Sequence, residues 1–330
     1  MRKKTRLANR SSCSPIFMKT TLPSRSHLPV LAIFLCCMVW GTTFVIVKDA
    51  VTDIDPFLLS AFRNLLAVIV LFIFLLLSKK IALLKVKNGV KYGAILGVLL
   101  GAIYAIQSTG LIYTTSNHSA FISCSAVVMV PIFMYFMGWQ KFTLKQVFAI
   151  MVITVGLFLL TFKPGLIHFN YGDFLTFIAA IICAIHLILS GHFVRKIDFL
   201  PLIFYQFLFA TLGSFIGLFI KYFLHHQEPI LFNTTVIPNV LYLGLLGTLF
   251  CYFVTVWGQK HVSTVYTALI FSLEPIFASI VSFIILGEVF TRNEIIGAIS
   301  IFIGVVYYSL PKNLVIETIN KIKKLIHLGE

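Results

Sequence analysis

Ten apolar runs dominate this chain of 330 residues, and each is close to the roughly 20 residues that a helix needs to cross a bilayer. Each run predicts a membrane-spanning helix, because a helix satisfies its own backbone hydrogen bonds where water is absent. The gaps between the runs are too short for a soluble catalytic domain. We expect an all-α polytopic membrane protein with spans at about 28–48, 56–78, 92–113, 117–138, 143–162, 172–194, 200–222, 236–258, 264–287 and 292–310.

The composition indicates that lipid is the main solvent. The chain is 59% hydrophobic and only 11% charged, whereas a soluble domain carries roughly 25% charged residues. Its net charge of +15 does not indicate a nucleic-acid partner, because the basic residues lie in the gaps and at the two ends instead of forming one patch. Its six cysteines have no metal-ligand spacing, so no metal or cofactor is expected.

The distribution of Lys and Arg predicts the orientation. With the N-terminus in the cytoplasm, only Lys48, Lys163, Lys221 and Arg292 fall in outer loops, and the inner segments hold nearly all the others. Both termini are therefore expected in the cytoplasm, with the protein in the cytoplasmic membrane. Residues 1–27 form a basic tail, 163–171 an external linker, and 311–330 an amphipathic tail on the membrane surface.

The sequence contains an internal repeat with an offset of 148 residues. TSNHSAFI at 115–122 matches STVYTALI at 263–270, which makes the repeat unit about five spans long. Since five is odd, the second copy enters the membrane upside down. Two inverted halves, 28–162 and 172–310, are typical of transporters that work by alternating access, with the site at the midplane between them.

Several motifs resemble those of EamA-type permeases of the drug/metabolite transporter superfamily. WGTTFVIVK at 40–48, Arg63 after Pro56, and AFI at 120–122 running to Pro131 are similar to the first half of such permeases. WGQKHVSTVYTALIFSLEPIFASIVSFIILGE at 257–288 is similar to the second half. The resemblance implies ten helices, two cytoplasmic termini and export or exchange of small metabolites, but it does not name a solute.

Glu274 and Pro275 lie near the middle of the ninth apolar run. A charge at that depth costs about 3 kcal/mol on insertion scales, so an intramembrane carboxylate usually has a partner or a function. Pro275 offers no N–H to the carbonyl of Phe271, which weakens the helix beside the carboxyl group. Glu274 is open to three interpretations: a protonated group bonded to a neighbouring helix, an ion paired with Arg63, or a proton-coupling group.

Further residues are candidates for lining a central cavity. Arg63 either extends its stem to the outer interface or faces the cavity and attracts an anionic group of the solute. Polar and aromatic side chains within other spans either support packing or reach the same cavity. The expected set is Trp40, Arg63, Tyr104, Gln107, Ser123, His186, Tyr252, Trp257 and Glu274.

Small residues predict where helices approach one another closely. The candidates for such packing are Gly93, Gly97, Gly101, Gly156 and Gly304. The sequence favours a secondary transporter of a small organic solute that is amino-acid-like or drug-like. A channel, another membrane protein that transports nothing, or a membrane-embedded enzyme is the alternative, although no catalytic constellation or selectivity-filter pattern is visible. The oligomeric state, monomer or homodimer, is left open.

Overall fold

The structure is a computed structural model and describes residues 27–161, 170–224, 231–286 and 291–310. The basic tail, most of the external linker and the amphipathic tail lie outside these residues. In the first half, the spans are α1 (Leu28–Ala50), α2 (Pro56–Leu77), α3 (Gly89–Tyr113), α4 (Ser116–Cys124) with α5 (Ala126–Phe136), and α6 (Leu144–Thr161). A short 3₁₀ turn, η1 (Ile81–Lys85), precedes α3.

The second half repeats this order of spans. It contains α7 (Tyr171–Phe193), α8 (Phe199–Leu224), a composite third span, an interrupted fourth span made of α11 (Thr264–Phe271) and α12 (Glu274–Leu286), and α13 (Arg292–Ser309). The composite helix consists of η2 (Thr234–Val236), α9 (Ile237–Tyr242), a π-helical segment η3 (Leu243–Phe250) and α10 (Cys251–Gln259). The ten spans expected from the apolar runs are thus all helical in the described chain.

Length and composition agree with a membrane location. Eight of the described helical spans are long and apolar enough to cross a membrane, and the apolar part of α6 is shorter. Large apolar side chains such as Phe136 and Phe219 remain exposed on the outside of the bundle. Such a surface suits lipid, because a soluble protein rarely leaves large contiguous apolar areas exposed. The molecule is an all-helical membrane protein.

Two spans are interrupted at corresponding places in the repeat. The hydroxyl of Ser125, between α4 and α5, donates to the backbone carbonyl of Ile122 at 2.6 Å. The hydroxyl of Ser272, between α11 and α12, donates to the backbone carbonyl of Leu269, also at 2.6 Å. Helix α12 begins at Glu274, so Pro275 lies in its first turn, where a missing N–H costs little. The predicted weakness beside Glu274 is therefore a true break between two helices.

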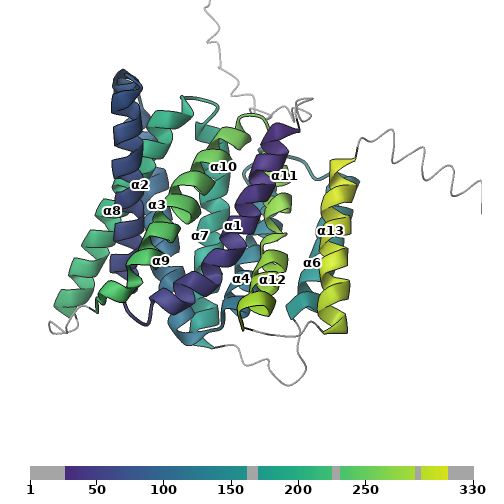
Figure 1. The fold of residues 1–330 in the computed structure, drawn as a ribbon. Coiled ribbons are helices and arrows are strands. Elements are labelled where there is room, and N and C mark those ends of the chain that lie inside the picture. Colours follow the sequence, from purple (N-terminus) through teal and green to yellow (C-terminus); the bar gives the residue numbers. More distant parts are fainter. Residues whose placement is uncertain (1–26, 162–169, 225–230, 287–290, 311–330) are drawn as a thin grey trace, which may run out of the picture.

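The two halves interlock instead of lying side by side. Helix α3 of the first half contacts α7 and α8 of the second, while α10 and α12 contact α1. Helices α6 and α13, one from each half, lie together at one edge of the bundle (Figure 1). Each half therefore completes its packing only in the presence of the other.

Glycines occupy the closest helix contacts, among them all five glycines selected from the sequence. A Cβ atom on Gly97 would lie 2.5 Å from the carbonyl oxygen of Gln206 and 2.9 Å from the amide nitrogen of Ala210 in α8. At the other edge, a Cβ on Gly156 would lie 2.7 Å from the carbonyl oxygen of Gly297. Backbones this close leave no room for a side chain. The residues concerned are Gly93, Gly97 and Gly101 in α3, and Gly156 and Gly304 in the α6–α13 pair.

We predict that Gly97→Ala destabilises the protein by about 1–3 kcal/mol, because the added methyl group overlaps the backbone of α8. Gly213→Ala is the matched control, since a Cβ at Gly213 meets nothing within 4 Å. Thermal unfolding of both variants in detergent, followed by size-exclusion chromatography, measures the difference. Equal melting temperatures for the two variants would show that the contact between α3 and α8 is looser than described.

Candidate functional site

A cavity of about 100 Å³ lies between helices of both halves. Of the nine cavity residues expected from the sequence, eight line it: Trp40, Arg63, Tyr104, Gln107, Ser123, His186, Tyr252 and Glu274. Trp257 does not, because its ring lies beside the ring of His261, with centroids 5.3 Å apart. Small-molecule sites usually measure roughly 300–1,000 Å³, so this cavity has to widen before it can hold an organic solute.

Arg63 is buried and held at one wall of the cavity. Only 3% of the residue is exposed, so it does not extend to the outer interface. Its Nε atom donates to the hydroxyl of Thr248 at 2.8 Å, and its guanidinium carbon lies 3.7 Å from the ring centroid of Tyr104. The hydroxyl orients the planar guanidinium, and the ring face stabilises its charge. The cation is held in place without an acidic partner within 4.0 Å in the described chain.

Glu274 lines the same cavity from the start of α12. It is 9% exposed, and a carboxylate in the first turn of a helix is favoured by the helix dipole. Among the described residues, no ion pair joins Glu274 to Arg63 or to another base. The ion pair considered from the sequence is therefore not formed in this conformation. One cavity thus contains a buried cation and a buried carboxyl group held apart.

Aromatic rings line the same cavity. The indole N–H of Trp40 donates to the carbonyl oxygen of Gly247 at 2.8 Å, which fixes the ring across the centre of the bundle. Its ring contacts Tyr252 and Phe271 edge to face, with centroids 5.4 and 4.9 Å apart. Tyr252 in turn contacts Tyr104 at 6.1 Å. These rings offer apolar surface to a solute.

Two of the predicted polar side chains of the cavity are bonded to other side chains. Gln107 donates from Nε2 to the hydroxyl of Ser123 at 2.8 Å, which links α3 to the interrupted span. The Nε2 atom of His186 lies 3.3 Å from Oε1 of Gln206. Neither His186 nor any other described residue belongs to a cluster that could hold a metal ion.

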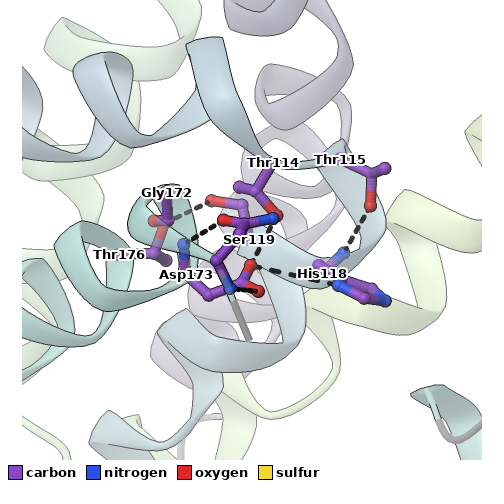
Figure 2. Close-up of polar contacts among 8 residues, drawn as sticks. Thr114, Thr115, His118, Ser119, Gly172, Asp173 and Thr176 are labelled. Carbon is purple, nitrogen blue, oxygen red and sulfur yellow. Dashed lines mark hydrogen bonds and ion pairs between the residues drawn. The ribbon is translucent and has the colours of Figure 1, made fainter. Parts of the chain in front are cut away.

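A polar cluster joins the two halves where α3 ends and α4 and α7 begin (Figure 2). The hydroxyl of Thr114 donates to Oδ1 of Asp173 at 2.5 Å, and Nδ1 of His118 lies 3.9 Å from the same oxygen. Asp173 also caps its own helix together with Asn170. A second hydroxyl pair, Ser119 and Thr176, lies 3.4 Å apart. Thr114 and His118 belong to the first half and Asp173 to the second, so the cluster ties the halves together.

Sequence reasoning missed this cluster and also missed Thr248. Asn170 and Asp173 have the spacing of a helix cap, which indicates where α7 begins but not which residue of another helix they meet. Thr248 lies in the π-helical segment η3, and this wider helix has no simple sequence signature. In both cases the contact depends on how distant helices pack.

Two inverted five-helix halves around a buried polar cavity define a membrane transporter fold. The EamA-like transporter family model matches residues 27–162 and 170–310, and the chain belongs to that family. An uncharacterized transporter of Archaeoglobus fulgidus is 29% identical over 280 residues, covering 85% of each chain. The uncharacterized transporter YoaV of Bacillus subtilis is 23% identical over 283 residues, covering 84% of this chain and 94% of its own length.

A solved structure has the same fold. This crystal structure is 15% identical in sequence, and its comparison with the present chain gives a TM-score of 0.67. The match covers 85% of this chain and 96% of the other. At that level of identity the likeness extends to the fold alone. The family match, together with its transporter relatives, identifies the protein as a membrane transporter, a class of protein without enzymatic activity.

Proposed function

We propose that this transporter moves a small organic metabolite, amino-acid-like or drug-like, across the cytoplasmic membrane by alternating access, in the direction of export or exchange. The observation that carries the proposal is the placement of Arg63 and Glu274 at one cavity without an ion pair between them. A solute with an anionic group would bind Arg63, while aromatic walls would hold its apolar part.

The small volume of the cavity supports a cycle with a change of shape. At about 100 Å³ the cavity is smaller than the usual site for an organic solute, so solute entry needs movement of one half against the other. The interrupted spans provide places for such movement, since helix breaks beside a midplane site are common in transporters with inverted repeats. In this proposal both termini lie in the cytoplasm, as the distribution of Lys and Arg indicates.

The solute can be found without prior assumptions about its chemistry. Metabolites in the medium of cells that lack the protein are compared with those of cells that overproduce it, and the compound that changes is then tested in proteoliposomes. A transporter shows saturable counterflow, in which unlabelled solute on one side drives labelled solute across from the other. A channel alternative predicts flux that does not saturate and shows no counterflow.

We predict that Arg63→Lys abolishes most transport although it keeps the positive charge. Lysine cannot donate to Thr248 through Nε while pairing with a carboxylate in the same plane. Loss of two charge-assisted hydrogen bonds, each of about 1.5–3 kcal/mol, weakens solute binding by 100-fold or more. Counterflow of the identified solute measures this, with the amount of folded protein matched between variants. Normal transport by Arg63→Gln would remove Arg63 from the binding site.

We predict that Glu274→Gln separates net transport from exchange. Glutamine preserves the shape and hydrogen bonding of the side chain but cannot exchange a proton. If Glu274 carries a proton between the two faces, net flux driven by a proton gradient is lost while solute exchange persists.

Both fluxes are measured in proteoliposomes across a pH series. Wild-type values for the variant in both assays, with an unchanged pH profile, would refute the proposal that Glu274 couples transport to protons. Glu274 would then have a structural role. This outcome would leave transport itself intact.

A further inference from the structure

Four buried side-chain oxygens near the ends of α7 and α10 and the start of α11 have no hydrogen-bond partner within the described chain. They are Ser190 Oγ, Thr255 Oγ1, Gln259 Oε1 and Thr264 Oγ1, and each residue is at most 2% exposed. Buried polar atoms in proteins nearly always have a partner, which is either a protein group or an ordered water molecule. Four such atoms in neighbouring helices therefore point to a shared ligand.

The orientation of these hydroxyl groups is not the usual one for a helix. Several other Ser and Thr side chains donate to the carbonyl four residues earlier, as Thr211 does to Phe207 at 2.9 Å. Ser190 and Thr255 make no such bond, so their hydroxyl groups remain available to another partner. The residues that bond back in this way include Thr109, Thr154, Thr176, Thr211, Ser300 and Ser309.

The four oxygens, here called the run, lie on three helices that contact one another, α7, α10 and α11, and the run starts at the cavity. Ser190 and Thr255 line the cavity, and Gln259 lies one helical turn beyond Thr255. The amide of Gln259 donates to the carbonyl of Leu187 in α7 at 3.0 Å. Thr264 lies close to Gln259, because both approach Gly191. A Cβ on Gly191 would lie 2.3 Å from the hydroxyl of Thr264 and 3.2 Å from Nε2 of Gln259.

The far end of the run reaches the turn between α10 and α11. Lys260 and His261 in that turn are exposed, and the orientation proposed above assigns the turn to the cytoplasmic face. The run therefore extends from the cavity toward the side of the bundle where this exposed turn lies.

At the corresponding positions of the first half, the described residues form no equivalent run. The offset of 148 residues places Gln107, Leu111 and Ser116 at the positions that correspond to Thr255, Gln259 and Thr264. Gln107 is bonded to Ser123, and Ser116 donates to the carbonyl of Phe44 at 3.3 Å. Leu111 is apolar and 1% exposed. At these three repeat positions, the side chains of the second half are polar and lack hydrogen-bond partners for the oxygens named above. Those of the first half are either apolar or already hydrogen-bonded.

We propose that the run is a path for water between the cytoplasmic face and the central cavity. Water molecules satisfy the four oxygens in turn and keep the cavity hydrated from that side, while Leu111 closes the outer side. The proposal rests on the cytoplasmic orientation given under the proposed function, and it adds a route for water-sized ions to the charged groups of the site.

Cys183 provides a reporter for this path, because it lines the cavity and is not fully buried. A protein that retains Cys183 alone, with the other five cysteines replaced, is placed in membrane vesicles of either orientation. Silver ions, applied as the nitrate, move through hydrated routes and react with thiols. We expect Cys183 to react faster when silver is added on the cytoplasmic side.

Gln259→Leu combined with Thr255→Val makes the path apolar, and the first change copies Leu111 of the other half. We expect the cytoplasmic reaction to slow by about tenfold or more, since water in the path loses its hydrogen-bond partners. Thr211→Val is the control, because Thr211 is buried but already bonded within α8. It should leave the rate unchanged.

An unchanged rate in the double variant, or faster reaction from the outer face, would overturn the water path. If the double variant does not reach the membrane, Gly191→Ala provides the same test, since its methyl group would displace the hydroxyl of Thr264. The reaction of Cys183 does not require transport. A chain that lacks transport but shows the expected silver reactivity would refute the proposed solute function and leave the path standing.

Discussion

Everything at the centre of this molecule depends on keeping a cation and a carboxyl group inside a lipid-facing bundle without pairing them. A guanidinium in such a place is expensive unless other groups replace its hydration. The Thr248 hydroxyl and the Tyr104 ring do this for Arg63. Glu274 instead has the N-terminal end of α12. Because each group is supported by its own helices, the space between them remains available to a solute.

The interrupted helices follow from the same requirement. In a continuous helix through residues 264–286, the backbone carbonyl and amide groups near Glu274 would all be hydrogen-bonded to one another. The break at Ser272 creates a new helix N-terminus beside the carboxyl group. The first half breaks at Ser125 without any charge, so the break belongs to the repeat and the charge was placed on one copy only. The helix break therefore occurs in both halves, whereas the carboxyl group occurs in the second half only.

The sequence could predict the spans, the repeat and the break beside Glu274, because these depend on local composition and on a proline at a recognisable position. It also selected Arg63 and Tyr104 as cavity candidates, since polar side chains in lipid need interior partners. It failed where three-dimensional contact decides the outcome. Trp257 is also a polar aromatic residue within a span, but its ring lies against His261. Nothing in the local sequence distinguishes Thr248 from other threonines, and only the packing of η3 places it beside Arg63. The bond between Thr114 and Asp173 joins helices that are distant in sequence, so no local pattern indicates it.

Movement of the two halves against each other around the cavity is tested most directly by paired distance measurements. Spin labels at His118 and Tyr171 report on the cluster of Figure 2, and labels at Leu28 and His261 report on the opposite face. Pulsed electron paramagnetic resonance would be recorded with and without the transported solute in lipid nanodiscs. Alternating access predicts two distance populations for each pair. When solute shifts these populations, the distance across one face lengthens while the distance across the other face shortens. A single distance for each pair, unchanged by solute, would contradict it.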